Sequence, residues 1–211
     1  MEIYRTISGE AEATNIIEKS RFIAHVRPVQ TREEADAFIE EIKGRYRDAT
    51  HNVPAMVVGE KSQIQWASDD GEPQGTAGAP VVQMLIKEGI TNIAVVVTRY
   101  FGGIKLGTGG LVRAYTSSVK LALEKAGLCG VMEMCSLEVE VEYTYLAKFR
   151  SMAGEVFDIA HLEYGEKVTM NMHIKTEDED RIKRLINDVT SGRAVLKKTE
   201  KILVQKSLDI E

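Results

Sequence analysis

The sequence predicts an α+β fold made of two domains. In the first half, residues 92–115 have the pattern of a buried strand, a glycine-rich turn and the start of a helix. In the second half, strand and helix patterns follow one another in the order βαββαβ. The two halves have different element orders and meet near residues 128–134. We therefore expect one domain at residues 1–128 and another at residues 129–211.

Composition and charge exclude several classes of protein. The chain has 211 residues, of which 44% are hydrophobic and 28% charged, as in ordinary globular proteins. No apolar run approaches the length of a membrane span, and residues 1–20 lack the pattern of a signal peptide. We therefore expect a cytoplasmic protein without membrane contact, with Cys129 and Cys135 as free, packed thiols. The net charge of -5 argues against broad non-specific binding to nucleic acid, which needs a basic surface.

Alternating and helical patterns predict the elements of the first domain. Residues 20–28 alternate apolar and polar side chains, as a half-buried strand does. Thr31 and Glu34 then form a capping box that opens a helix. Further strands are expected at residues 3–9, 53–59, 63–67 and just before the glycine-rich turn, and further helices at residues 79–87 and from that turn to Ala126, where Gly127 caps the end.

The second domain reads as a ferredoxin-like unit. Leu137, Val139 and Val141 alternate with polar residues and predict a strand with one wet face. The remaining expected elements are a helix over residues 146–156, strands at 159–163 and 168–174, a helix opened by a capping box at Thr176 and Glu179, and a last strand at 194–205. Residues 129–211 contain 12 Lys and Arg against 16 Asp and Glu, a net charge of -4, so this domain is the acidic one.

The glycine-rich turn is the main candidate site. Five of the 17 glycines lie between Gly102 and Gly110, and no Asp or Glu occurs from Gly89 to Leu123. A loop with free backbone N–H groups, a helix N-terminus and nearby cations suits a phosphate. The alternative is that the glycines only permit a tight turn from strand to helix. The candidate phosphate- or nucleic-acid-binding residues are Arg99, Tyr100, Gly102, Gly103, Lys105, Gly107, Gly109, Gly110 and Arg113.

Two specific phosphate motifs do not match this turn. Gly102 and Gly107 have the spacing of a P-loop, but Thr108 stands where the phosphate-binding lysine belongs. A dinucleotide fingerprint also fails, because the third glycine and the acidic residue that should follow it are missing. The adjacent aromatic residues Tyr100 and Phe101 either stack on a base or anchor the loop.

An acidic loop at residues 68–73 is the second candidate. Asp69, Asp70 and Glu72 are three carboxylates within four residues, which could hold Mg²⁺ or Ca²⁺. They lack the alternating ligand positions of an EF-hand, and a solvated turn is the simpler alternative. A third alternative joins the two candidate loops, with carboxylates pairing to Arg99 or Arg113 across a cleft.

His51 precedes a strand and has polar neighbours, which makes it a candidate base or ligand. A lone histidine is more often structural, and the other histidines show no metal-ligand spacing. No nucleophile signature of the form GxSxG occurs. We therefore keep Asp69, Asp70, Glu72 and His51 as candidates only, and we expect no metal and no cofactor.

Four segments carry a resemblance to a known family. In order they are SRFIAHV, DATHNVPA, SDDGEPQGTAGAPV and AVVVTRYFGGIKLGTGGLVRAY. On these segments the chain resembles the Impact/YigZ family over about residues 15–127, and its second half is similar to the C-terminal domain of the bacterial YigZ branch. Val53 departs from the family pattern, in which a cysteine is usual, and this argues against cysteine chemistry at that position.

The resemblance implies a fold and a cellular process in which the protein acts. The family's first domain resembles the second domain of ribosomal protein S5, and its second resembles a ferredoxin-like domain of an elongation factor. Together they are similar to the last two domains of elongation factor G. The eukaryotic relatives regulate translation initiation through a kinase-activator pathway.

Two functions remain open at this point. The first is a non-enzymatic protein that binds RNA or the ribosome through the glycine-rich turn and regulates translation, with the acidic domain orienting the first domain or meeting a protein partner. The second is an enzyme that acts on a phosphorylated or nucleotide ligand, with the carboxylates of residues 69–72 opposite the turn. Carboxylates converging on the turn would favour the enzyme, and carboxylates held in ion pairs would favour the binding protein. The sequence does not indicate the oligomeric state.

Overall fold

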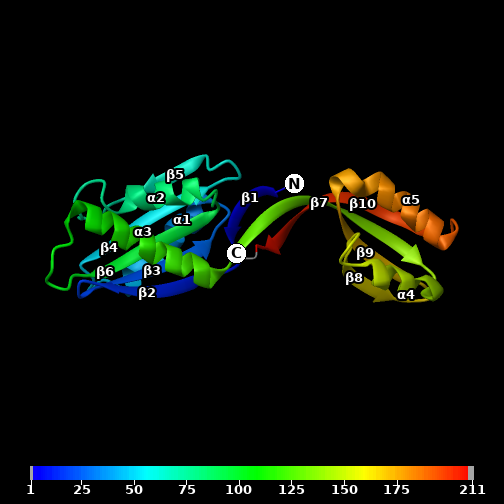
Figure 1. The fold of residues 1–211 in the computed structure, drawn as a ribbon, viewed down its shortest axis with the longest axis horizontal. Coiled ribbons are helices and arrows are strands. Elements are labelled where there is room, and N and C mark those ends of the chain that lie inside the picture. The colour runs from blue at the N-terminus through cyan, green and yellow to red at the C-terminus, as the bar shows by residue number, and fades with distance from the viewer. Residues whose placement is uncertain (1, 209–211) are drawn as a thin grey trace. The chain divides into compact units, whose positions relative to one another are not determined.

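The computed structural model describes residues 2–208, which form two compact units (Figure 1). One unit comprises residues 3–131 with residues 205–208, and the other comprises residues 132–204 with Glu2. Each unit combines a β-sheet with helices, so the predicted two-domain α+β fold class is confirmed. In the described part of the chain no helix is long and apolar enough to cross a membrane.

The first unit is built on a five-stranded antiparallel sheet in the order β2-β3-β6-β4-β5. Its strands are β2 (Ala11–Ile17), β3 (Ser20–Pro28), β4 (His51–Val58), β5 (Ile64–Ala67) and β6 (Ile93–Tyr100). Its helices are α1 (Arg32–Arg45), α2 (Gly78–Lys87) and α3 (Gly107–Ala126). The first strand of the chain, β1 (Glu2–Ile7), pairs in the other sheet.

The central strand β6 is buried on both faces. Ile93, Val95 and Val97 belong to the apolar cluster that includes residues of α2 and α3, whereas Ala94 and Val96 belong to the cluster that includes residues of α1. A strand covered on both sides needs no polar alternation, which explains its continuous apolar run. The last residues of the strand, Arg99 and Tyr100, therefore follow directly on a segment that is packed on both faces.

The start of α1 follows from its capping box. The hydroxyl of Thr31 accepts a hydrogen bond from the backbone N–H of Glu34 at 3.2 Å. The carboxylate of Glu34 accepts in return from the N–H of Gln30 at 2.7 Å, one residue before the cap. These bonds satisfy backbone donors that have no partner inside the helix.

Strand β2 is absent from the sequence-based expectations. It pairs with β3 in a hairpin whose two turn residues, Glu18 and Lys19, have φ values of 46° and 65°. This pair of left-handed residues is the geometry of a tight two-residue hairpin turn, which usually contains Asn or Gly. Because the turn lacks those residues and β2 itself is half polar, neither the turn nor the strand has a clear sequence signal.

The second unit has the predicted element order. Its elements are β7 (Leu128–Val141), α4 (Tyr143–Met152), β8 (Asp158–Tyr164), β9 (Val168–Lys175), a short 3-10 helix (Thr176–Asp178), α5 (Glu179–Thr190) and β10 (Val195–Ser207). The sheet order is β1-β7-β9-β8, with β10 also paired to β7. Apolar residues of β7 and β9 alternate inward and pack against α4 and α5.

The capping box predicted at Thr176 is wrong. Residues Thr176–Asp178 form a 3-10 turn, and α5 begins at Glu179, after Asp178, without a side-chain cap. The tighter turn places Thr176 inside the first turn instead of before it, so its hydroxyl cannot take the capping position. Glu179 instead pairs with Lys183, one helical turn further along.

Candidate functional site

Arg99, near the end of β6, lies in a buried ion pair. Its Nη1 donates to Oε1 of Glu72 at 2.6 Å, and the two side chains are only 6% and 3% exposed. Its Nη2 donates to the Ser20 hydroxyl at 3.4 Å, and the guanidinium lies over the ring of Phe22. Arg99 therefore faces inward, and the candidate acidic loop meets the glycine-rich turn through it, which is the carboxylate–arginine pairing considered from the sequence.

Tyr115 of α3 completes this buried network. Its hydroxyl donates to the same Oε1 of Glu72 at 2.7 Å. Burial, together with the Glu72 carboxylate, raises the pKa of Tyr115 well above its ordinary value. The hydroxyl therefore stays protonated and acts as a donor, so Glu72 ties β6 and α3 together. Sequence reasoning missed Tyr115, because a buried tyrosine on an apolar helix face gives no signal beyond packing.

Asp69 organises the start of α2. Its carboxylate accepts hydrogen bonds from the backbone N–H groups of Gly75, Ala77 and Gly78 at 2.7, 3.1 and 2.9 Å. Burial alone would raise the pKa of Asp69, but these three N–H groups outweigh it, and the pKa lies below its ordinary value. This carboxylate is occupied by local structure.

Asp70 joins the acidic loop to α1 and to β4. Its Oδ1 pairs with Nζ of Lys43 at 3.1 Å, and its Oδ2 accepts from the backbone N–H of Asn52 at 2.7 Å. Among the described residues no group of three or more His, Cys, Asp or Glu side chains could hold a metal ion. The three candidate carboxylates thus point to three different partners instead of converging on one ion.

His51 begins β4 and pairs in register with Arg99 of β6. Its Nδ1 lies 2.7 Å from the backbone carbonyl oxygen of Asp70, and its Nε2 lies 3.8 Å from Oε2 of Glu72. The structure therefore brings together two of the predicted regions, the strand start at His51 and the acidic loop. They meet at a cavity of about 440 Å³, which we call the His51 cavity, lined in part by His51, Glu72, Arg99, Phe101, Lys105 and Thr108.

The glycines of the turn meet several distinct structural needs. Gly103 and Gly107 have φ values of 87° and 70°, in the region that favours glycine. Gly102 has no such angle, but a Cβ there would collide with the backbone of Lys19 and Ser20. A Cβ on Gly110 would come within 3.0 Å of the Leu106 Cβ. The tight turn considered from the sequence accounts for these glycines without any ligand.

Tyr100 contacts neighbouring protein groups, and Gly109 has room for a Cβ atom. The Tyr100 hydroxyl donates to Asp48 at 3.0 Å, and the guanidinium of Arg21 lies 4.4 Å from the centre of its ring. The position that a Cβ would take on Gly109 is 3.6 Å from Nη1 of Arg113, which is ordinary contact. Tyr100 is thus held by protein groups on both its ring and its hydroxyl.

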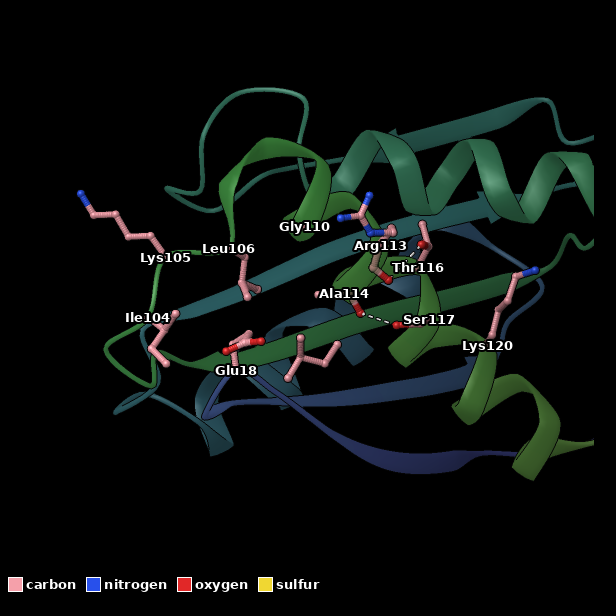
Figure 2. Close-up of a pocket in the computed structure, with 11 residues that line it drawn as sticks. Glu18, Ile104, Lys105, Leu106, Gly110, Arg113, Ala114, Thr116, Ser117 and Lys120 are labelled. Carbon is pink, nitrogen blue, oxygen red and sulfur yellow. Dashed lines mark hydrogen bonds between the residues drawn. The ribbon is translucent and has the colours of Figure 1, made fainter.

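A second hollow, of about 650 Å³, runs beside α3, and we call it the α3 groove. Figure 2 shows Lys105 on the glycine-rich turn, Arg113 and Lys120 on α3, and Glu18 on the turn between β2 and β3. Lys120 pairs with Glu88 at 3.2 Å, whereas Lys105 and Arg113 form no ion pair with any residue that the structure describes. Lys105 lines both the α3 groove and the His51 cavity.

The predicted site residues therefore separate into two groups. Arg99 belongs to the buried network, while Lys105 and Arg113 are exposed at the α3 groove. Lys120 and Thr108, which sequence reasoning did not select, line the groove and the cavity respectively. The spacing of Arg113 and Lys120, seven residues on one helix, is the signal that could have placed them on the same face.

Comparison with known proteins identifies the family to which the chain belongs. Residues 18–123 match the Impact N-terminal domain, and residues 139–193 match a domain of unknown function, DUF1949. The crystal structure of a hypothetical protein is similar to this chain, with 32% sequence identity and a TM-score of 0.59, and the match covers 93% of this chain and 97% of that chain.

Two curated bacterial relatives match over most of their length. The IMPACT family member YvyE of Bacillus subtilis (strain 168) is 38% identical over 207 residues, covering 98% of this chain and 95% of the relative. The IMPACT family member YigZ of Escherichia coli (strain K12) is 40% identical over 157 residues, covering 74% of this chain and 77% of the relative. The chain belongs to the IMPACT family.

Proposed function

We propose that this protein is a non-enzymatic binding protein that contacts RNA, on the ribosome or free, through the α3 groove and acts in translation. One observation carries the proposal: Lys105 and Arg113 line an open groove and have no carboxylate partner among the described residues. Cations without an internal partner are available for phosphate oxygens, and such contacts supply most of the affinity in nucleic-acid binding.

The fate of the carboxylates also supports a binding protein. Asp69 accepts from backbone N–H groups, Asp70 pairs with Lys43, and Glu72 is held by Arg99 and Tyr115. An enzyme that used these groups to hold a metal opposite the glycine-rich turn would need them to converge, and they do not. In this proposal Arg99 supports the turn from within, and Lys105 and Arg113 make the phosphate contacts.

The proposal that the protein acts in translation rests on its family. The chain belongs to the IMPACT family. The resemblance carried by the four sequence segments implies that the eukaryotic relatives regulate translation initiation, so the translation apparatus is the expected setting. The acidic second domain, with its net charge of -4, would be repelled by RNA phosphates and so is assigned to a protein partner or to orienting the first domain. The resemblance of the two domains to the last two domains of elongation factor G supports the same setting.

Direct binding measurements test the proposal. The purified protein is titrated with structured RNA and with isolated ribosomal subunits at several salt concentrations. We expect binding that weakens as salt rises, because released counterions drive it, and that weakens further in Lys105→Ala. Absence of binding, or binding that does not depend on salt, would refute the proposal.

A further inference from the structure

The lining of the His51 cavity includes hydrogen-bond acceptors to which no described residue donates. Oε1 of Glu72 accepts from Arg99 and Tyr115, but no described residue donates to Oε2. Nδ1 of His51 lies 2.7 Å from the Asp70 carbonyl oxygen, and in the tautomer that donates to this oxygen Nε2 presents a lone pair. Nε2 and Oε2 are 3.8 Å apart, and both side chains line the cavity. Two neighbouring acceptors in a nearly buried place are suited to hydroxyl groups of a ligand.

The lining of the His51 cavity also includes the start of α3. Helix α3 begins at Gly107 without a side-chain cap and has no acidic residue in its first turn. The first N–H groups of a helix have no acceptor within it, and they lie at the positive end of its dipole. Lys105 and Thr108 also line the cavity. Together these groups offer a positive charge, a hydroxyl and free N–H donors to a phosphate.

The lining also includes apolar side chains and an exposed aromatic ring, Phe101, whose centre lies 5.4 Å from the guanidinium carbon of Arg99. Phe101 is 46% exposed, which is unusual for a phenylalanine that borders a cavity. Leu106 and Leu111 also line the cavity. A flat ring next to apolar side chains offers a surface on which a base can stack. The volume of about 440 Å³ lies within the range of pockets that hold small ligands.

We propose that the His51 cavity binds one nucleotide monophosphate unit. Its phosphate lies at the start of α3 beside Lys105, its sugar hydroxyls donate to Glu72 and His51, and its base stacks on Phe101. The unit is either a free nucleoside monophosphate or one unpaired residue of an RNA chain that continues into the α3 groove. The free form is independent of the proposed function, whereas the RNA form rests on it.

Nuclear magnetic resonance titration of the labelled full chain tests this assignment. The probes are AMP, UMP, adenosine and inorganic phosphate. We expect AMP and UMP to shift the amide signals of Gly107 and Thr108 and the ring signals of His51. Adenosine and phosphate alone bind more weakly, because each makes only part of the contacts.

Thr108→Asp is the decisive variant. A carboxylate in the first turn of α3 suits the helix dipole, so the fold is retained, but it repels a phosphate. Nucleotide affinity should fall by about tenfold or more, the usual consequence of losing a charge-assisted hydrogen bond. Thr199→Asp adds the same charge at an exposed position of β10 and should bind as wild type does. Phe101→Ala should weaken AMP and leave inorganic phosphate unchanged.

A short oligouridine separates the two sources of the ligand. If UMP shifts the cavity signals and Thr108→Asp abolishes the shift, the free nucleotide is supported. If only the oligouridine shifts them and Thr108→Asp weakens it, the RNA residue is supported. If no probe moves these signals, or Thr108→Asp binds as wild type does, the assignment is overturned. Salt-dependent binding of structured RNA that Thr108→Asp leaves unchanged would overturn this assignment alone and leave the proposed function standing.

Discussion

The guanidinium of Arg99 and the carboxylate of Glu72 form a 2.6 Å ion pair in which both side chains are more than nine-tenths buried. It connects the end of β6 with the acidic loop, and through Tyr115 it reaches α3. A buried pair of this kind costs desolvation energy, and its partners become destabilising when separated. The cavity wall therefore depends on both members being present.

Removing one member of the pair should destabilise the protein strongly. Glu72→Ala leaves the Arg99 charge buried without a counter-ion, and the expected loss is about 3–5 kcal/mol in the free energy of unfolding. Urea denaturation followed by circular dichroism measures it. Arg32→Ala, which breaks an exposed pair with Asp36 on α1, is the matched control and should change stability little. Equal, small effects of the two variants would contradict the role given to the buried pair.

Gly102 should be intolerant of any side chain. A Cβ there would meet the backbone of Lys19 and Ser20, which cannot move aside as a flexible side chain can. Gly102→Ala should therefore cost about 1–3 kcal/mol or more, as overpacking does. Gly44→Ala is the control: nothing lies within 4 Å of the added atom in α1, and alanine should stabilise that helix by about 0.5–1 kcal/mol. Thermal unfolding of the two variants should shift in opposite directions.

The salt dependence of RNA binding should report individual cations of the α3 groove. Each lost phosphate contact lowers the slope of log affinity against log salt by about 1. Arg113→Ala should show this reduction. Lys61→Ala removes an exposed cation from the β4–β5 hairpin, outside the residues that line the groove, and should leave the slope unchanged. A slope that changes equally in both variants would mean that binding is spread over the surface.

Stability should depend on pH through His25 of β3. Burial lowers the pKa of His25 below its ordinary value of 6.5, and attraction to Glu12, 3.1 Å away, only partly opposes this. As the pH falls through 6.5, His25 binds a proton in the unfolded chain but not in the folded chain. The free energy of unfolding therefore decreases. His25→Gln should flatten the decrease between about pH 7 and pH 5.

The control for this pH dependence is His161→Gln, at an exposed position of β8. Denaturation in urea at a series of pH values provides the comparison. If wild type and His25→Gln lose stability in parallel as the solution is acidified, His25 is not the group responsible.

Local chemistry made several elements predictable. The Thr31 cap, the apolar run of β6 and the glycine after α3 each act within a few residues, so their signals lie in the sequence. The cap at Thr176 did not behave in this way, because the chain tightened into a 3-10 turn that the same residue pattern permits. Strand β2 depends on its pairing with β3, which no local pattern announces.

The candidate site was predictable in its parts but not in its arrangement. The basic residues and the acidic loop stand out in the sequence, yet whether a cation faces outward depends on strand register and on helix packing. Arg99 lies one residue before the end of a strand buried on both faces, and its inward direction follows from Glu72 and Ser20, which are distant in sequence. Lys105, on the glycine-rich turn, and Arg113, in the second turn of α3, are exposed, and this follows from the packing of α3 and not from their own residue type.

The close approach of Gly102 to the β2–β3 hairpin has an evolutionary consequence. Another small residue could fill the volume of the Ser20 side chain. It could not replace the Ser20 hydroxyl oxygen, which accepts hydrogen bonds from both the Gly102 N–H and Arg99. Positions 20, 99 and 102 should therefore be inherited as one unit across homologous chains, changing together or not at all. A shared sequence pattern at the turn would then reflect common ancestry and the need to hold the turn in place. Homologues that share the pattern would be free to differ in what they bind.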